Sequence, residues 1–163
     1  MNPIYRHPEL KDVDGMLNVE QSCFEPDEQM DRDDFVEVVN NVSAMSFVID
    51  VDGEIAGMIS CRTTDKDVLD NESYYEDLAP KATDTNLAVL GLAVLPKYQG
   101  AGLATELLKR AEAVAKTDGL TSLILDCRDR LIPFYEKYGF QLLRRSNSTF
   151  GDIKWFGMQK KLK

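Results

Sequence analysis

The sequence predicts one α/β domain, over residues 1–163, built around a sheet of mixed strand direction. Its 163 residues fit the usual size of a single domain. A chain of that length can bury a hydrophobic core without disulfides or metals. Two strands joined by a hairpin turn are predicted in the first half, and strands alternate with amphipathic helices in the second half. Hairpins make strands antiparallel and helical crossovers make them parallel, so one sheet is expected to contain both directions.

The first elements are predicted to be a short strand and two helices. Residues 4–6 are compatible with a strand, and residues 12–24 carry apolar side chains on roughly one face of a helix that contains Gly15. Asp31 can cap a second helix, because its carboxylate can accept N–H groups that the first turn leaves unpaired. The apolar side chains along one side of that helix are Phe35, Val38, Val39 and Val42.

A β-hairpin is predicted next. Residues 46–51 and 54–61 flank Asp52-Gly53, a dipeptide that favours a two-residue hairpin turn because both positions adopt positive φ. Residues 64–85 are polar and are interpreted as a mobile excursion with one helical piece near residues 68–79.

The second half begins with an alternation of strand and helix. Residues 86–95 are an apolar run suited to a buried strand, and residues 122–127 are a second such run. Between them, residues 102–118 repeat apolar side chains at helical spacing, and Gly119 follows where a C-capping glycine is common. This strand–helix–strand order is one of the two observations that predict a sheet of mixed direction.

The last elements are a short helix and two strands. Asp129 is predicted to cap the helix, which should end at Gly139. Residues 140–145 and 153–161 are predicted to be the final strands, joined by a turn at residues 147–152.

Composition argues against several classes of function. The net charge of −9 opposes nucleic-acid binding. The sequence also has no run of 18 apolar residues, the length that a membrane-spanning helix needs. The N-terminal residues lack the apolar core of a signal peptide, so a cytoplasmic location is expected. Three cysteines (Cys23, Cys61 and Cys127) and one histidine (His7) argue against a disulfide framework, a structural zinc site and a Ser-His-Asp triad.

Charge is distributed unevenly along the chain. Residues 1–86 contain 21 acidic and 6 basic residues, whereas residues 87–163 contain 7 acidic and 13 basic residues. Either this asymmetry serves solubility, or the first half binds a cation and the second half an anion.

The segment most informative about chemistry is a glycine-containing turn between the strand at residues 86–95 and the helix at residues 102–118. Gln99, Gly100 and Gly102 occupy this turn. Small residues let backbone N–H groups converge, and the unpaired N–H groups of a first helical turn favour an anion. A phosphate or pyrophosphate is therefore the expected ligand; the alternative is an ordinary tight strand–helix turn.

Two common phosphate-binding motifs fit this turn poorly. A Walker A loop requires Gly-Lys-Ser/Thr, which the chain lacks. A dinucleotide fold would use Gly100, Gly102 and a ribose-binding acid such as Asp126. However, Thr105 stands where the third glycine belongs, and the glycines come several residues after the strand. Acyl-coenzyme A is the third candidate.

Several segments make the sequence resemble the GNAT superfamily of acetyl-CoA-dependent N-acetyltransferases. Residues 99–104, Gln-Gly-Ala-Gly-Leu-Ala, fit the family's pyrophosphate signature Gln/Arg-x-x-Gly-x-Gly/Ala, and residues 94–98 fit the positions before it. Residues 131–140 resemble the second motif, whose tyrosine serves the departing thiol. Residues 92–94 and 127–135 look like the arylalkylamine (serotonin) N-acetyltransferase branch.

The resemblance implies a fold, a cosubstrate and a reaction. The fold would be a mixed, mostly antiparallel sheet of about seven strands, splayed at the acetyl-CoA site and flanked by about four helices. The reaction would move an acetyl group directly from acetyl-CoA to a primary amine of a small cationic acceptor, such as an arylalkylamine or a polyamine. No metal, nucleic acid or membrane is expected, and a homodimer is left open. The residues expected at acetyl-CoA are Leu92, Ala93, Val94, Gln99, Gly100, Ala101, Gly102, Leu103, Ala104, Thr105 and Phe134.

Tyr135 is the predicted general acid. A phenol with a pKa near about 10 can protonate a departing thiolate whose conjugate acid has a pKa near about 8.5. Tyr138, three residues further on, is the local alternative. The backbone N–H of Val94 is expected to polarise the thioester carbonyl.

The general base has more than one candidate. The arylalkylamine branch has two histidines at positions that are Ala88 and Leu90 here. Asp126, acting through a water molecule, is the first candidate and Glu20 is the second, while deprotonation by bulk water needs no residue. The missing histidines also suggest an alternative function, a non-catalytic acyl-CoA-binding sensor.

Three further features bear on the acceptor side. Cys127 would form an acyl-enzyme only with an activating neighbour, so a packed thiol is expected. The acidic residues between 25 and 34 either attract cationic amines or form a solvated loop. The aromatic residues considered for the acceptor pocket, or otherwise for the core, are Phe24, Phe47, Tyr74, Tyr75 and Phe150.

Overall fold

A seven-stranded sheet forms the centre of the protein in the computed structural model, which describes residues 1–145 and 154–162. The strand order is β1-β2-β3-β4-β5-β7-β6, and only the β4–β5 pair is parallel. The strands are β1 (Pro3–Arg6), β2 (Phe47–Val51), β3 (Glu54–Thr64), β4 (Asn86–Val94), β5 (Ser122–Cys127), β6 (Gln141–Arg145) and β7 (Phe156–Lys161). The expected mixed, mostly antiparallel sheet is confirmed.

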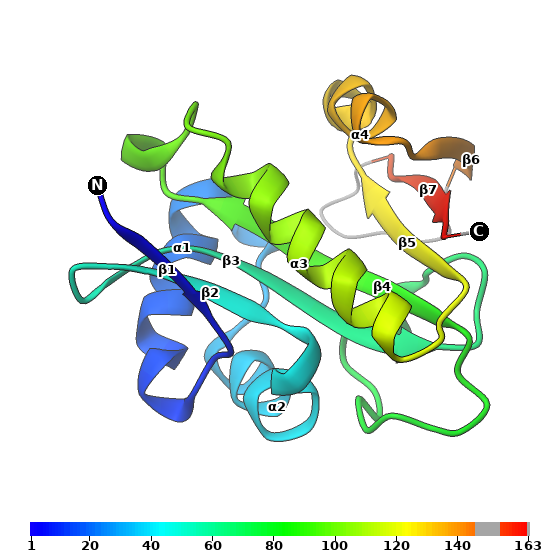
Figure 1. The fold of residues 1–163 in the computed structure, drawn as a ribbon, viewed down its shortest axis with the longest axis horizontal. Coiled ribbons are helices and arrows are strands. Elements are labelled where there is room, and N and C mark those ends of the chain that lie inside the picture. Colours follow the sequence, from blue (N-terminus) through cyan, green and yellow to red (C-terminus); the bar gives the residue numbers. More distant parts are fainter. Residues whose placement is uncertain (146–153, 163) are drawn as a thin grey trace.

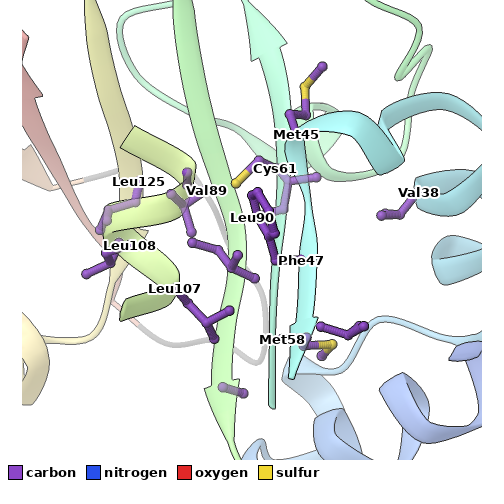
Figure 2. Packing of buried hydrophobic residues seen from close by; sticks show 14 of the residues in the cluster. Val38, Met45, Phe47, Met58, Cys61, Val89, Leu90, Leu107, Leu108 and Leu125 are labelled. Carbon is purple, nitrogen blue, oxygen red and sulfur yellow. The ribbon is translucent and has the colours of Figure 1, made fainter. Parts of the chain in front are cut away.

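Four α-helices flank this sheet, as expected: α1 (Val13–Cys23), α2 (Arg32–Val42), α3 (Leu103–Thr117) and α4 (Ile132–Tyr138). In Figure 1, α3 crosses in front of the sheet and α1 lies behind it. Close up, Leu107 and Leu108 of α3 lie on one side of β4, and Val38 of α2 lies on the other (Figure 2). Both faces of the central strands are therefore covered, and most residues of β3 and β4 are buried.

Local sequence signals account for the boundaries of several elements. Asp31 caps α2 by accepting the backbone N–H of Asp34, whose carboxylate accepts the N–H of Asp31 in return. The hairpin turn between β2 and β3 has positive φ at both Asp52 and Gly53, as the dipeptide predicted. Gly119, with a φ of +74°, follows the C-terminus of α3.

Gly15 explains how α1 comes close to the sheet. A Cβ at this position would lie 2.5 Å from the Cγ1 atom of Ile55 in β3, so only glycine fits without displacing that side chain. Because α1 is held close to β3, Glu20 near its C-terminal end is brought into the interior.

Four expectations need correction or lie outside the described residues. Asp129 does not cap α4: it begins a 3₁₀ turn over Asp129–Leu131, and Leu131 is the N-cap of the helix. The helical piece expected near residues 68–79 is a single 3₁₀ turn over Asn71–Tyr74. The last strand begins at Phe156 instead of residue 153, and the predicted turn at residues 147–152 lies outside the described residues. Across the described chain, no helix is both long enough and apolar enough to cross a membrane.

Candidate active site

The sheet splays between β4 and β5. Their parallel pairing runs only from Asn86–Ser122 to Val89–Leu125. Beyond that point β4 stays paired with β3 as far as Val94, while β5 stays paired with β7 as far as Cys127. A wedge therefore opens along the second half of β4, and the strand edge that faces it has no neighbouring strand.

A β-bulge marks the point where the wedge begins. In the β3–β4 ladder Ser60 pairs with Gly91 and Cys61 pairs with Val89, so Leu90 is the extra residue. A bulge increases the local twist of a strand and bends the strand at that point. Here it turns residues 91–94 away from β5 while they remain bonded to β3.

The backbone of Val94 presents its N–H to the wedge. The N–H of the next residue, Leu95, donates to the carbonyl of Ala56 in β3 at 2.8 Å, and N–H groups alternate sides along a strand. The carbonyl of Val94 already accepts hydrogen bonds from Cys23 Sγ at 3.3 Å and from Gln99 Nε2 at 2.9 Å. The N–H is thus the group of Val94 that a ligand in the wedge could use.

The glycine turn opens α3 with its N–H groups unused by the helix. Gly100 and Gly102 have φ of +84° and +79°, in the left-handed region that favours glycine. A Cβ at either position would meet no atom within 4 Å, so both face open space. The first helical hydrogen bond joins the N–H of Glu106 to the carbonyl of Gly102, and no side chain caps the helix. This geometry suits an anion.

The wedge and the turn form one groove of about 430 Å³. It contains ten of the eleven residues expected at acetyl-CoA; the exception is Ala101, which does not line it. Gln99 lines the groove too, but its amide is engaged with the Val94 carbonyl. The lining residues outside the expected set are Cys23, Phe24, Tyr98, Arg130, Leu131 and Tyr135.

A second, smaller cavity of about 80 Å³ adjoins the groove. Phe24, Leu92, Arg130, Leu131 and Tyr135 line both, so these five mark the junction. The smaller cavity is called the acceptor pocket hereafter, because an amine acceptor is expected beside acetyl-CoA. It contains both carboxyl groups that the sequence offered as candidate bases. Its other lining residues are Glu20, Glu28, Met30, Tyr74, Val89, Leu90, Gly91, Leu125, Asp126, Cys127, Arg128 and Trp155.

Tyr135 lies at the junction and Tyr138 does not. The Tyr135 side chain is 7% exposed and contacts Phe134 and Phe140 edge-on, while burial raises the pKa of its hydroxyl. Tyr135 therefore keeps its proton at neutral pH, as a general acid must. Tyr138 packs toward β7 instead, where Lys160 Nζ lies 4.4 Å from the centre of its ring.

Glu20 is a buried carboxyl group in the acceptor pocket. It is 4% exposed, and its Oε2 accepts the backbone N–H of Met30 at 2.8 Å. Burial raises its pKa to about 7; the hydrogen bond from Met30 opposes this shift, and the nearby Asp34 and Glu28 add to it. A carboxyl group that titrates near neutral pH can accept a proton there.

Glu20 ranks below Asp126 as a base on sequence alone, although the sequence holds a signal for its burial. Val13, Met16 and Glu20 follow the i, i+3, i+7 spacing of one helix face, and all three are buried. Asp126, at the end of β5, lines the same pocket and is partly buried.

Cys127 has the environment of a packed thiol. It is 2% exposed, and its Sγ lies 3.6 Å from Met158 Sδ. Burial, with a smaller contribution from Asp126 and Asp129, raises its pKa to about 12, so thiolate is scarce at neutral pH. Although Cys127 lines the acceptor pocket, this environment argues against an acyl-cysteine mechanism.

The aromatic candidates divide between the site and the rest of the fold. Phe24 and Tyr74 line the acceptor pocket. Phe47 belongs to the core and its ring lies 4.6 Å from that of His7, whereas Tyr75 is 44% exposed. Phe150 is outside the described residues. Within the part of the chain that the structure describes, no group of three or more His, Cys, Asp and Glu side chains could hold a metal ion.

A mixed sheet that splays beside a glycine turn, with a small pocket at the junction, has a geometry that suits an extended ligand with an anionic end and a second, smaller ligand beside it. The model of the Acetyltransferase (GNAT) family matches residues 13–140 of this sequence. The chain belongs to that family.

Two solved structures are similar to this chain in fold, and one curated protein is similar to it in sequence. The GNAT-like decarboxylase GphF, solved in complex with isobutyryl-CoA, has a TM-score of 0.85 at 16% identity and covers 98% of this chain and 100% of its own. PaiA N-acetyltransferase from Thermoplasma acidophilum, solved with coenzyme A, has a TM-score of 0.74 at 16% identity and covers 99% of both chains. The probable hydrolase YhcX of Bacillus subtilis is 26% identical over 149 residues, which are 87% of this chain and 28% of that protein. The chain thus spans under a third of that relative's length.

Proposed function

We propose that residues 1–163 act as one acetyltransferase domain that transfers an acetyl group from acetyl-CoA to a primary amine. The main observation in support of this proposal is that the groove with the glycine turn meets the acceptor pocket at Leu92 and Tyr135. Acetyl-CoA as cosubstrate is supported by the open cradle at Gly100 and Gly102, and by the coenzyme A compounds in the solved structures of GphF and PaiA.

The groove residues would hold the cosubstrate at two places. The N–H groups of the turn and of the first residues of α3 would bind the pyrophosphate, because they have no acceptor within the helix. The free edge of β4 would bind the pantetheine amides as an added strand would, through main-chain groups of residues 91–94. The N–H of Val94 would stabilise negative charge on the thioester oxygen.

The pocket residues would handle the protons. Glu20, directly or through water, would accept the proton that the attacking amine loses, and Asp126 is the alternative base in the same pocket. The amine nitrogen forms the new C–N bond as the C–S bond breaks, and Tyr135 would donate its hydroxyl proton to the departing sulfur. Leu90 lines the pocket at one of the two positions where the arylalkylamine branch has histidine, so a carboxyl group would act in place of an imidazole.

An assay of amine-dependent thiol release tests the proposed function. Acetyl-CoA is combined with phenethylamine, spermidine, glucosamine, lysine and a peptide with a free N-terminus, and released free thiol is measured. Turnover with at least one amine supports the acetyltransferase, and a preference for phenethylamine would support the arylalkylamine branch. If acetyl-CoA raises the melting temperature but no amine gives turnover, the alternative function, a non-catalytic acyl-CoA-binding sensor, is favoured.

The Glu20→Gln variant tests the base. The pKa near 7 predicts that wild-type kcat/KM rises with pH through a limb centred near pH 7, because the base must be ionised. The variant should lose this limb and about 10²-fold in kcat, the low end for a lost general base because water can also deprotonate the amine. Glu37→Gln, an exposed residue on α2, should leave the profile unchanged. If Asp126→Asn removes the limb and Glu20→Gln keeps it, Asp126 is the base.

The same substitution should change stability in a defined direction. Glu20 has a folded-state pKa of about 7 against its usual 4.5, so its ionisation opposes folding. Stability from this group is complete below pH 4.5 and is lost as the pH rises through about 7. The melting temperature of Glu20→Gln relative to wild type should therefore increase between pH 5 and pH 8. A constant difference across that range would contradict the burial of an ionisable Glu20.

A further inference from the structure

The acceptor pocket contains two arginines as well as its carboxylates. Arg128 and Arg130 lie in the segment between β5 and α4, and both line the pocket. Their presence is unexpected for a pocket that would receive only a cation, because like charges repel in a partly dehydrated space. The arginines therefore indicate that the acceptor has a second functional group, besides its amine, that a cation could bind.

Arg128 is held in place by an ion pair and still has N–H donors that form no hydrogen bond among the described residues. Its Nη1 donates to Glu28 Oε1 at 2.9 Å, and the Glu28 side chain is only 2% exposed. A buried carboxylate from the segment before α2 thus fixes the guanidinium at the pocket wall. Among the described residues this is the only hydrogen bond of the Arg128 side chain, and a guanidinium has five N–H donors in a planar fork.

Arg130 is a second cation, at the junction itself. Its side chain is exposed and lines both the pocket and the groove. Its backbone N–H donates to Asp129, but within residues 1–145 and 154–162 its guanidinium forms no ion pair or hydrogen bond. Glu20, Glu28 and Asp126 are the carboxyl groups that line the pocket, and Glu28 forms the ion pair with Arg128. Three acidic and two basic side chains therefore line one small cavity.

We propose that the natural acceptor is bipolar: it carries a carboxylate or phosphate near its primary amine, and Arg128 and Arg130 bind that anion. This inference rests on the proposed function, because it names the substrate class of the same site. The amine lies toward Glu20 and Asp126, where carboxylates attract it as a cation before deprotonation. The anion lies toward the guanidinium groups, which bind carboxylate and phosphate oxygens through paired, charge-assisted hydrogen bonds.

Matched pairs of acceptors test the proposal directly. Each pair differs only in the anion: phenethylamine and phenylalanine, cadaverine and lysine, glucosamine and glucosamine 6-phosphate. The anionic member of at least one pair should have a kcat/KM about 10- to 100-fold higher, because hydrogen bonds to charged groups contribute about 1.5–3 kcal/mol. The first two pairs probe a carboxylate, and the third probes a phosphate.

Variants of Arg128 and Arg130 test whether these two residues cause the preference for the anionic acceptor. Arg130→Gln should reduce the preference within the favoured pair at least tenfold. Arg128→Gln alone would leave Glu28 buried without its partner, so Glu28→Gln/Arg128→Gln is used, which replaces the ion pair by two amides. It too should reduce the preference. Arg144→Gln, the same charge change at an exposed position on β6, should keep it.

The outcomes separate this proposal from the proposed function. Turnover in which the anion-free member of every pair is favoured would overturn the bipolar acceptor and leave the acetyltransferase intact. A preference that survives both arginine variants would also overturn it, as would an Arg130→Gln variant that raises only the KM for acetyl-CoA. No turnover with any member of any pair would instead count against the proposed function itself.

Discussion

A Gly102→Asp variant is expected to lose coenzyme A binding. Gly102 is the N-cap of α3, has a φ of +79°, and faces open space where a phosphate would meet the helical N–H groups. An aspartate there would add a side chain in that space and a negative charge against the pyrophosphate, so sterics and charge act together. Affinity measured by calorimetry should fall by about 10²-fold or more, since two effects of about 1.4 kcal/mol each already give that factor.

Two control variants separate ligand loss from damage to the fold. Gly119→Asp introduces the same residue at a φ of +74°, also facing open space, but at the other end of α3. It should bear a comparable conformational cost of about 1 kcal/mol while keeping coenzyme A affinity. Gly102→Ala adds only the Cβ and should lose less affinity than aspartate. Wild-type affinity in a folded Gly102→Asp protein would remove the glycine turn from the site.

The features of the fold that are determined by residues close together in the sequence were predictable. The positive φ at Asp52 and Gly53 and the capping of α2 by Asp31 are set within a few residues. Asp129 is the instructive exception, because a capping residue type was present but Leu131 occupies the cap after an added 3₁₀ turn. The preference of Asp for helix N-termini located the helical region correctly but misplaced the first residue of α4. The ends of helices are the part that such predictions define least well.

The candidate site was predictable where it is made of contiguous chain. The residues of the glycine turn lie next to one another in the sequence, and all but Ala101 of the expected set line the groove. The acceptor pocket is different, because Glu28 and Arg128 are 100 positions apart and meet only through the fold. The pKa of Glu20 likewise depends on burial between α1 and the chain at Met30, which no local pattern specifies.

Tyr135→Phe is expected to keep the fold and coenzyme A affinity while losing turnover. The ring remains and can still contact Phe134 and Phe140, so only the hydroxyl is removed. Removal of a general acid should lower kcat by about 10²–10⁴. Burial raises the pKa of Tyr135 above its usual 10, so the hydroxyl stays protonated throughout the assay range. The variant should therefore lower the plateau of the pH profile without moving a limb.

The leaving group distinguishes an acid from a merely structural tyrosine. A thioester whose thiol is more acidic than coenzyme A needs less help from a proton donor, so Tyr135→Phe should slow its reaction less. Tyr138→Phe is the matched control: this ring lies against Lys160, outside both cavities, and its loss of a hydroxyl should cost little turnover. If Tyr138→Phe loses turnover while Tyr135→Phe keeps it, Tyr138 and not Tyr135 is the general acid. Wild-type rates in both variants would mean that the thiolate departs without a protein acid, and the proton would then come from water.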